Sequence, residues 1–191
     1  ALREPDRVPC CPEYMTFPFL WAGYTMAEVN YDMSKAEDAV RKYMLHFQPD
    51  MGGCDFGSLF CGQMGMMDRL GAKWMQWAGE PGSVVDEHSI FQYVEKEYLE
   101  EDEYDEMLTD LTGWMLKRYH PRIMGVMEPL KNLNFSAMRP YGFLAGTLAF
   151  CDPAVLESVR ILSEVGRDYA AFLGEVAKFN QEVVDLGFVQ K

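Results

Sequence analysis

The segment from Asp152 to Gly187 constrains the fold of this chain more than any other part of its sequence. Asp152-Pro153 is typical of a helix start, an N-cap residue followed by proline at the first helical position, and Gly187 is suited to a C-cap. Apolar residues recur at helical spacing between them. An unbroken helix over this span would be roughly 50 Å long, more than the diameter of a small domain. We therefore expect the helix to bend near Gly166 or Gly174, or to project from its domain.

A shorter helix and two strands are expected before this segment. A capping box begins at Ser34, and apolar residues then recur at helical spacing over 36–47 until Pro49 ends the helix. The apolar run at 7–12 is typical of a buried strand, and residues 50–54 are expected to form a second one. Strand, helix and strand in this order indicate a βα unit of a parallel sheet.

The middle of the chain is expected to hold short elements. Glycines interrupt residues 57–82, which favours short helices and loops, with an extended piece ending in a turn over 70–82. From 87 to 133 acidic and apolar residues interleave at helical spacing. Breaks between these helices are expected at Gly113 and Pro121.

Composition and charge exclude several classes of partner. The chain has 191 residues, of which 49% are hydrophobic, so it can bury a core. Its formal net charge of -13 disfavours nucleic acid and anionic membranes, and a polyanionic substrate would need a local basic pocket. The sequence contains neither an apolar signal segment nor an apolar stretch long enough for a transmembrane helix, and its five cysteines are odd in number. These features favour a cytoplasmic protein without a disulfide framework.

Several short stretches, taken in their order and spacing, resemble one known family. They are Ala1-Leu2-Arg3 with Asp6-Arg7-Val8-Pro9, Gln48-Pro49-Asp50, Leu70-Gly71 with Trp77-Ala78-Gly79, and Glu103-Tyr104-Asp105. They resemble the N-terminal part of the uroporphyrinogen-decarboxylase-like proteins, which include that decarboxylase and related corrinoid-dependent methyltransferases. None of these stretches is a catalytic signature, so the resemblance points to a family more than to a reaction.

The resemblance implies a fold class. The family fold is a (β/α)8 barrel with extra helices, and such a barrel needs about 250 residues. The chain would therefore be an α/β protein, the helix-rich N-terminal fragment of a (β/α)8 TIM barrel with an inserted helical region and at most two or three barrel strands. Residues 1–80 would supply the first strands and helices. Residues 81–191 would form the helical insertion and the long helical segment of the same domain.

The resemblance also implies an enzyme, nearer to the methyltransferases than to the haem-pathway decarboxylase. The decarboxylase carries arginines after its first strand to hold substrate carboxylates, whereas this chain has no arginine between Arg7 and Arg41. The methyltransferases use a zinc-bound thiolate that accepts a methyl group from a corrinoid. Their His-x-Cys pair and later Cys would follow Lys191. Zinc and a corrinoid would then be cofactors of the full-length protein, with no cofactor bound by these residues, and the substrate would be a small molecule or a corrinoid protein.

Two other functions remain open from the sequence. One is a decarboxylase, a carboxy-lyase that acts on a porphyrinogen or on a smaller carboxylate. The other is a non-catalytic helical binding module. An unfinished barrel would also expose apolar strand edges, which favours self-association or pairing with the missing half.

The candidate site residues follow from the position of barrel active sites at the carboxyl ends of the strands. Glu13 and Asp55 are the expected catalytic residues, since each follows a predicted strand. A carboxylate directly after a buried strand is costly unless it is paired or functional. Tyr14 and Arg139 are the expected substrate contacts, Arg139 because it stands alone in an uncharged stretch, where a structural ion pair is its alternative role.

Other polar residues have simpler interpretations. The adjacent Cys10 and Cys11, and Cys54 with Cys61, lack the spacing and the nearby histidine of a zinc site, so we expect buried apolar cysteines and no metal. The acidic run from Glu95 to Glu106 is typical of a solvated helix face, and a docking surface for a basic partner is the alternative.

Overall fold

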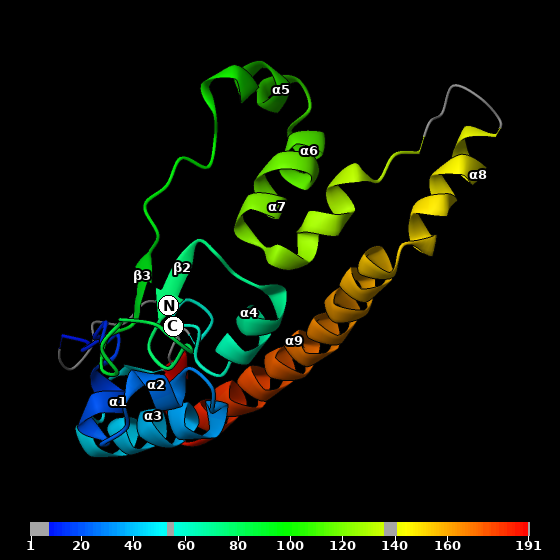
Figure 1. The fold of residues 1–191 in the computed structure, drawn as a ribbon. Helices are drawn as coiled ribbons and strands as arrows, with labels where there is room; N and C mark the ends of the chain where they lie inside the picture. The colour runs from blue at the N-terminus through cyan, green and yellow to red at the C-terminus, as the bar shows by residue number, and fades with distance from the viewer. Residues whose placement is uncertain (1–7, 53–55, 136–140, 191) are drawn as a thin grey trace. The chain divides into compact units, whose positions relative to one another are not determined.

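A computed structural model describes residues 8–52, 56–135 and 141–190 of the chain (Figure 1). Most of these described residues are helical, and few of them lie in strands. The chain forms two compact units, each assembled from separate stretches of sequence. Unit 1 contains residues 1–65, 77–92 and 169–191, and unit 2 contains residues 66–76 and 93–168.

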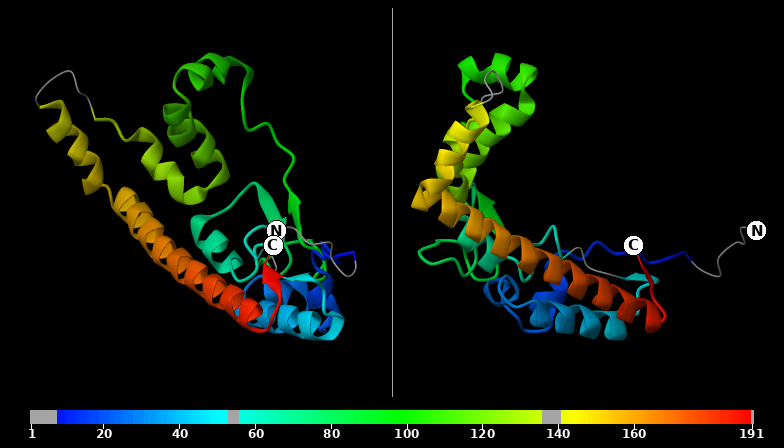
Figure 2. Two further views of the ribbon diagram at one scale, coloured as in Figure 1. Left: turned by 180° about the vertical axis from the view of Figure 1, so that it is seen from behind. Right: turned by 90° about the vertical axis from the view of Figure 1, so that its right-hand side faces the viewer.

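Unit 1 is built around the helix α3 (Met33–Phe47). The short helices α1 (Phe17–Trp21) and α2 (Met26–Val29) and the C-terminal part of α9 (Pro153–Asp185) lie beside it (Figures 1 and 2). Most of the apolar positions predicted for this helix form its buried face, whereas Phe47 at its end is exposed. The buried ones are Ala36, Ala39, Val40, Tyr43 and Met44. The helix ends before Pro49 as predicted, but its N-cap is Asp32, whose carboxylate accepts from the Ser34 backbone N–H at 3.0 Å.

Loops of unit 1 attach to α2 through a buried amide. Asn30 is fully buried, and its side-chain N–H donates to the carbonyl of Ala78 at 3.0 Å. The indole N–H of Trp77 donates to the Tyr31 hydroxyl at 3.0 Å. Buried amide groups need such partners, so these two bonds fix the turn after residue 77 against α2.

The strands are short. In unit 1, β1 (Met51–Gly52) pairs in parallel with β4 (Val189–Gln190). The strands β2 (Met75–Trp77) and β3 (Phe91–Tyr93) form a second two-stranded sheet, and both contain a point at which the chain passes from one unit to the other. The extended piece expected within 70–82, with its closing turn, is therefore confirmed.

The predicted fold class is wrong, because a fragment of a (β/α)8 barrel would need more and longer strands than these helices leave room for. The strand expected at 7–12 shows the physical reason. Residues 8–12 are not a strand, and Pro9 and Pro12 cannot donate a ladder hydrogen bond. Cys10 instead donates its N–H to the Asp50 carboxylate at 2.6 Å and accepts from the Asp50 N–H at 3.0 Å.

Unit 2 is largely a series of short helical segments, but the helices predicted from residue 87 begin only at Glu101, because residues 91–93 form β3 and residues 94–100 are irregular. A 3₁₀ turn, η1 (Glu101–Glu103), leads into α5 (Tyr104–Thr109). The chain then continues through α6 (Leu111–Trp114), the π-helical turn η2 (Met115–Tyr119), α7 (His120–Ile123) and the 3₁₀ helix η3 (Gly125–Asn132). The helix α4 (Met64–Leu70) precedes a backbone bridge from Ala72 to Met124.

Gly113 and Pro121 do not break the helix as expected, because residues 111–123 form one continuous helical run. Proline lacks an N–H and clashes with the carbonyl four residues earlier in an α-helix. The wider π turn avoids this conflict: the His120 N–H donates to Met115, five residues back. The helix therefore continues through Pro121 with one widened turn, where a break was predicted.

The long helix α9 runs unbroken over 33 residues and follows α8 (Gly142–Thr147) and η4 (Leu148–Cys151). Its predicted ends are confirmed: the Asp152 carboxylate accepts from the Ala154 N–H at 2.8 Å, and Gly187 adopts φ +94° after the last turn. Among the described residues no single helix is long and apolar enough to cross a membrane. The pair 142–151 and 153–185, bent by 82°, meets that test together by length and composition alone.

Candidate functional site

The structure describes two of the four predicted site residues. Glu13 is exposed in the loop before α1, and the Tyr14 ring packs on Tyr43 with a centroid distance of 4.5 Å. Asp55 and Arg139 lie outside the described residues. Glu13 does not follow a buried strand, because the strand expected before it is not formed. Neither Glu13 nor Tyr14 lines either of the two clefts described below.

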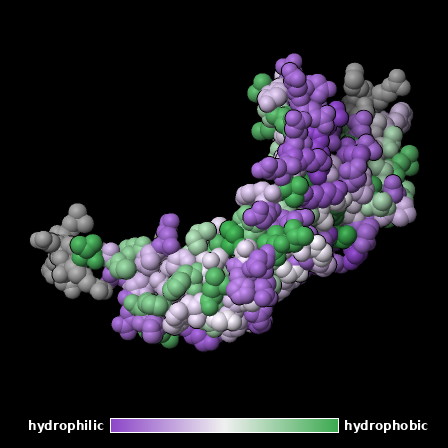
Figure 3. Space-filling view, turned by 60° about the vertical axis from the view of Figure 1, so that its left-hand side comes forward, coloured by the Kyte–Doolittle hydropathy of each residue, from purple (hydrophilic) through white to green (hydrophobic). Residues whose placement is uncertain are grey.

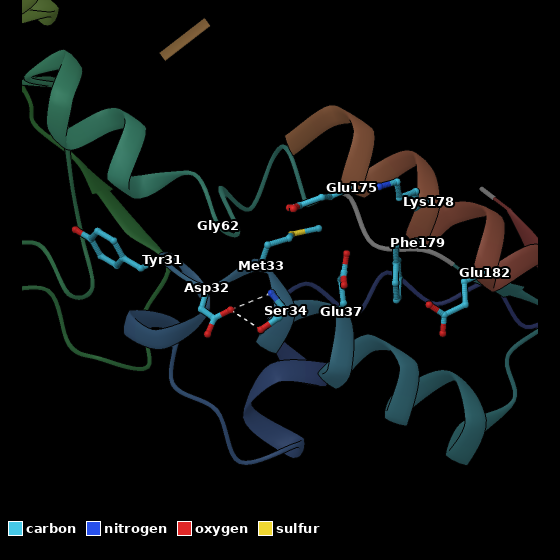
Figure 4. A pocket seen from close by; sticks show the side chains of 10 residues that line it. All are labelled: Tyr31, Asp32, Met33, Ser34, Glu37, Gly62, Glu175, Lys178, Phe179 and Glu182. Carbon is cyan, nitrogen blue, oxygen red and sulfur yellow. Dashed lines mark hydrogen bonds between the residues drawn. The ribbon is translucent and has the colours of Figure 1, made fainter. Parts of the chain in front are cut away.

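The first cleft lies in unit 1 between α3 and the C-terminal part of α9, with a volume of about 520 Å³. Figure 4 shows Glu37 from α3 and Glu175, Phe179 and Glu182 from α9 around it. Burial raises the pKa of Glu37, and the carboxylates of Glu175 and Glu182 raise it further.

Several charged side chains at this acidic cleft already form ion pairs or hydrogen bonds that stabilise α3 and its contact with α9. The Arg41 guanidinium donates to both carboxylate oxygens of Glu182, at 2.5 and 2.9 Å. Asp32 caps α3 through Ser34. No group of three or more side chains able to hold a metal ion occurs in the described part of the chain. We therefore interpret the acidic cleft as part of the packing of α3 on α9.

The second cleft lies in unit 2 and is lined by a concentration of positive charge. Its volume is also about 520 Å³. Four of the 17 lysines and arginines of this acidic chain line it, with two carboxylates at Glu106 and Glu128. The four cations are Lys117, Arg118, Arg122 and Lys131. We call it the basic cleft.

The local fold explains how these cations come together. Lys117 and Arg118 lie on the π turn η2, which widens the helix ahead of Pro121. Arg122 follows on α7, and Lys131 comes from the last turn of η3. A π turn changes the direction of the side chains on it, and such turns are frequent at functional sites.

Arg122 lines the cleft and is held in place by several contacts. It forms a two-pronged ion pair with the buried carboxylate of Glu103 and donates to the Tyr98 carbonyl at 3.0 Å. The Trp114 indole N–H also donates to Glu103, at 3.2 Å. The Arg122 guanidinium and these hydrogen bonds lower the pKa of Glu103 to about 2.

The other cations of the basic cleft are more loosely held. Arg118 is half exposed and lies 3.4 Å from Glu106, and Lys131 pairs with Glu128 on its own helix. Lys117 forms no ion pair within the described parts of the chain. Exposed ion pairs contribute only about 0–1 kcal/mol each, so an anionic ligand can replace them at little cost. The cleft is therefore suited chemically to a ligand with several carboxylates or a phosphate.

The sequence contained a signal for this site that the predictions missed. Between Leu111 and Leu133 the chain carries four cations and one carboxylate, shortly after the acidic run. That reversal of local charge marks a basic surface in a chain of net charge -13. The acidic run itself is largely exposed as predicted, with the exception of Glu103, but only residues 101–106 of it are helical.

The predicted buried cysteines are only partly found. Cys61 is buried, whereas Cys10, Cys11 and Cys151 are exposed, and Cys54 lies outside the described residues. Comparison of the chain with protein-family models, with curated proteins and with solved structures found no match. The functional argument therefore rests on the residues and their geometry.

Proposed function

We propose that this chain binds a small polycarboxylate in the basic cleft, as part of an enzyme of the uroporphyrinogen-decarboxylase-like class that acts on that carboxylate. The gathering of Lys117, Arg118, Arg122 and Lys131 around one cavity carries the proposal. A polyanionic substrate needs a local basic pocket in a chain of this net charge, and this cavity meets the need. Of the reactions that the sequence leaves open, decarboxylation is the one whose substrate carries carboxylates.

Three of the four cations divide into two roles in this proposal. Arg122 keeps the surface of the cleft fixed, because its own charge is compensated by Glu103. Lys117 and Arg118 supply the charge that a ligand carboxylate would meet, since both side chains are exposed. The arginine fork binds a carboxylate through two hydrogen bonds, whereas lysine acts as a point charge.

Corrinoid-linked methyl transfer, the function that the sequence resemblance favours, is the second candidate here, and that resemblance is what supports it. It requires a zinc-bound thiolate, for which the expected ligands follow Lys191. Zinc content in the full-length protein tests it directly. One zinc ion per chain, lost when a His-x-Cys pair is replaced, would favour methyl transfer over decarboxylation.

The binding proposal is tested by calorimetric titration of the chain with propane-1,2,3-tricarboxylate. Lys117→Ala and Arg118→Ala should each weaken binding about tenfold, the loss of one hydrogen bond to a charged group. Acetate, with one carboxylate, should bind too weakly to detect. Affinity for the tricarboxylate should fall as salt is added, since the contacts are exposed to solvent.

Arg160→Ala is the matched control for Arg118→Ala. The two arginines are equally exposed, at 54% and 52% of the side chain, and both are paired with glutamates. Loss of Arg160 should leave binding unchanged. Equal weakening by both substitutions would show that only the net charge of the chain matters, and unchanged binding by Lys117→Ala and Arg118→Ala would contradict the site.

Arg139→Ala separates this cleft from the contact predicted by sequence. If Arg139 holds a substrate carboxylate, its removal should weaken tricarboxylate binding as much as removal of Arg118. If Arg139 serves only in a structural ion pair, binding should be unchanged while the thermal midpoint falls.

A further inference from the structure

The basic cleft contains a carboxylate of its own beside an arginine that the proposed function assigns to the ligand. Glu106 comes from α5 and Arg118 from the π turn η2, so the pair joins two elements of unit 2. The Nε–H of Arg118 donates to a Glu106 carboxylate oxygen at 3.4 Å, and both residues line the cleft. In the free chain, Glu106 therefore occupies the guanidinium to which a ligand carboxylate would bind.

The ion pairs around the cleft decide how much of its positive charge a ligand can use. Arg122 and Lys131 each have a glutamate partner, and Glu106 is the partner of Arg118. Within the described residues, Lys117 is then the one cation of the cleft that forms no ion pair. A single carboxylate that binds at Arg118 instead of Glu106 exchanges one exposed ion pair for another, with almost no gain.

The pair of Arg118 and Glu106 is exposed enough for such an exchange. Their side chains are 52% and 38% exposed, and Figure 3 shows a largely hydrophilic surface on one face of unit 2. Ion pairs that reach solvent are weak, so a ligand can displace Glu106. A ligand with several carboxylates does so more readily, because a first contact at Lys117 holds its next carboxylate close to Arg118.

We propose that Glu106 is a specificity-determining residue of the basic cleft, which competes with the ligand for Arg118 and so restricts binding to ligands with several negative charges. This inference rests on the proposed function, because it concerns the same cleft. Binding sites gain specificity from a group that opposes the wrong ligand as well as from groups that attract the right one. Glu106 opposes a ligand with one carboxylate, whereas a polycarboxylate gains enough contacts to displace it.

Calorimetric titration with two ligands of the same carbon chain tests this inference. Propane-1,3-dicarboxylate lacks only the central carboxylate of propane-1,2,3-tricarboxylate. Glu106→Gln removes the competing charge and keeps the size of the side chain, so it should strengthen the binding of both ligands about three- to fivefold. The dicarboxylate should then bind Glu106→Gln about as tightly as the tricarboxylate binds the unsubstituted chain, because the site has lost one carboxylate in place of the ligand.

A double-mutant cycle shows whether Glu106 acts through Arg118. In the Arg118→Ala background, Glu106→Gln should change tricarboxylate affinity by less than about twofold, because no guanidinium is left to compete for. An equal gain in both backgrounds would contradict the inference, since the effect of Glu106 would then be one of general repulsion.

Glu157→Gln is the matched control, as Glu157 pairs with Arg160 outside the cleft. Each arginine keeps a second carboxylate nearby after the substitution, Glu103 at 3.9 Å from Arg118 and Glu164 at 2.6 Å from Arg160. The two substitutions also change the net charge equally. Glu157→Gln should leave the affinity for both ligands unchanged, and equal strengthening by both substitutions would overturn the inference.

The outcomes separate this inference from the proposed function. Tricarboxylate binding that Lys117→Ala weakens but Glu106→Gln leaves unchanged would overturn the inference alone. Absence of binding by both the unsubstituted chain and Glu106→Gln would overturn the proposed function and the inference with it. Circular dichroism of Glu106→Gln should match that of the unsubstituted chain, because an exposed ion pair contributes little to stability.

Discussion

At the scale of single residues, Glu103 shows how one position departs from its sequence context. It lies in an acidic run, yet its side chain is only 7% exposed. The carboxylate receives hydrogen bonds from Arg122 and Trp114, and Arg118 lies 3.9 Å away. A buried charge is tolerated when it is paired and hydrogen-bonded, and these contacts supply both conditions. Glu103 thereby joins η1, α6 and α7 in unit 2.

Removing this charge should destabilise the chain. Glu103→Gln leaves the Arg122 guanidinium, only 20% exposed, without its main partner, and we expect a loss of about 3 kcal/mol in the free energy of unfolding of unit 2. Urea denaturation measures this loss. Glu101→Gln, an exposed residue of the same 3₁₀ turn, should change stability by less than about 0.5 kcal/mol. An equal effect of both substitutions would contradict the role of the pair.

The same pair gives the direction of the pH dependence. The pKa of Glu103 is lowered in the folded state from 4.5 to about 2, so folding favours the ionised carboxylate. Its contribution is complete above pH 4.5 and is lost as the pH falls towards 2. The Glu103→Gln variant should therefore lose less stability than the unsubstituted chain as the pH falls from 4.5 towards 2. The pH profile of the unfolding midpoint measures this difference.

At the scale of elements, replacing glycine by alanine should have opposite effects on stability inside α9 and just after its end. A Cβ at Gly166 or Gly174 would meet no atom within 4 Å, and both glycines have ordinary helical backbone. Replacement by alanine should therefore raise the free energy of unfolding by about 0.5–1 kcal/mol at each position. Thermal unfolding followed by circular dichroism measures the change.

Gly187 is the control for this prediction. Its φ of +94° ends α9 in a Schellman motif, in which the Phe188 N–H donates to Val183 at 3.2 Å and the Gly187 N–H to Val184 at 2.9 Å. Gly187→Ala should destabilise by about 1 kcal/mol, because a side chain is strained in this conformation. Stabilisation by Gly187→Ala, or destabilisation by Gly166→Ala, would show that α9 is not one continuous helix with this end.

The elements also show what the sequence could predict. Local rules located α3 by its periodicity and both ends of α9 by their caps, because these depend on residues a few positions apart. The strand at 7–12 was predicted from its apolar residues alone, whereas Pro9, Pro12 and the distant Asp50 decide its structure. The Glu103–Arg122 pair spans 19 residues, and no local pattern specifies such a partner. The predicted roles of Asp55 and Arg139 stay predictions.

At the scale of the whole molecule, the distribution of charge is the feature that connects fold and function. The chain is strongly acidic, yet its π turn and the segments after it gather cations around one cleft. The resemblance to the uroporphyrinogen-decarboxylase-like proteins rests on a few short stretches of sequence alone, because no comparison found a match and the helical fold does not provide the barrel strands that it implied. The basic cleft gives the proposed binding of a carboxylate ligand a physical basis that does not depend on that fold.

The location of the bound ligand tests this account most directly. Heteronuclear NMR spectra of the labelled chain, recorded during titration with propane-1,2,3-tricarboxylate, report which backbone amides the ligand affects. The account predicts saturable shifts at residues 117–122 and 128–132, with the amides around Glu37 and Glu175 unaffected. Shifts confined to unit 1, or no saturable shift, would contradict the assignment of the basic cleft as the binding site.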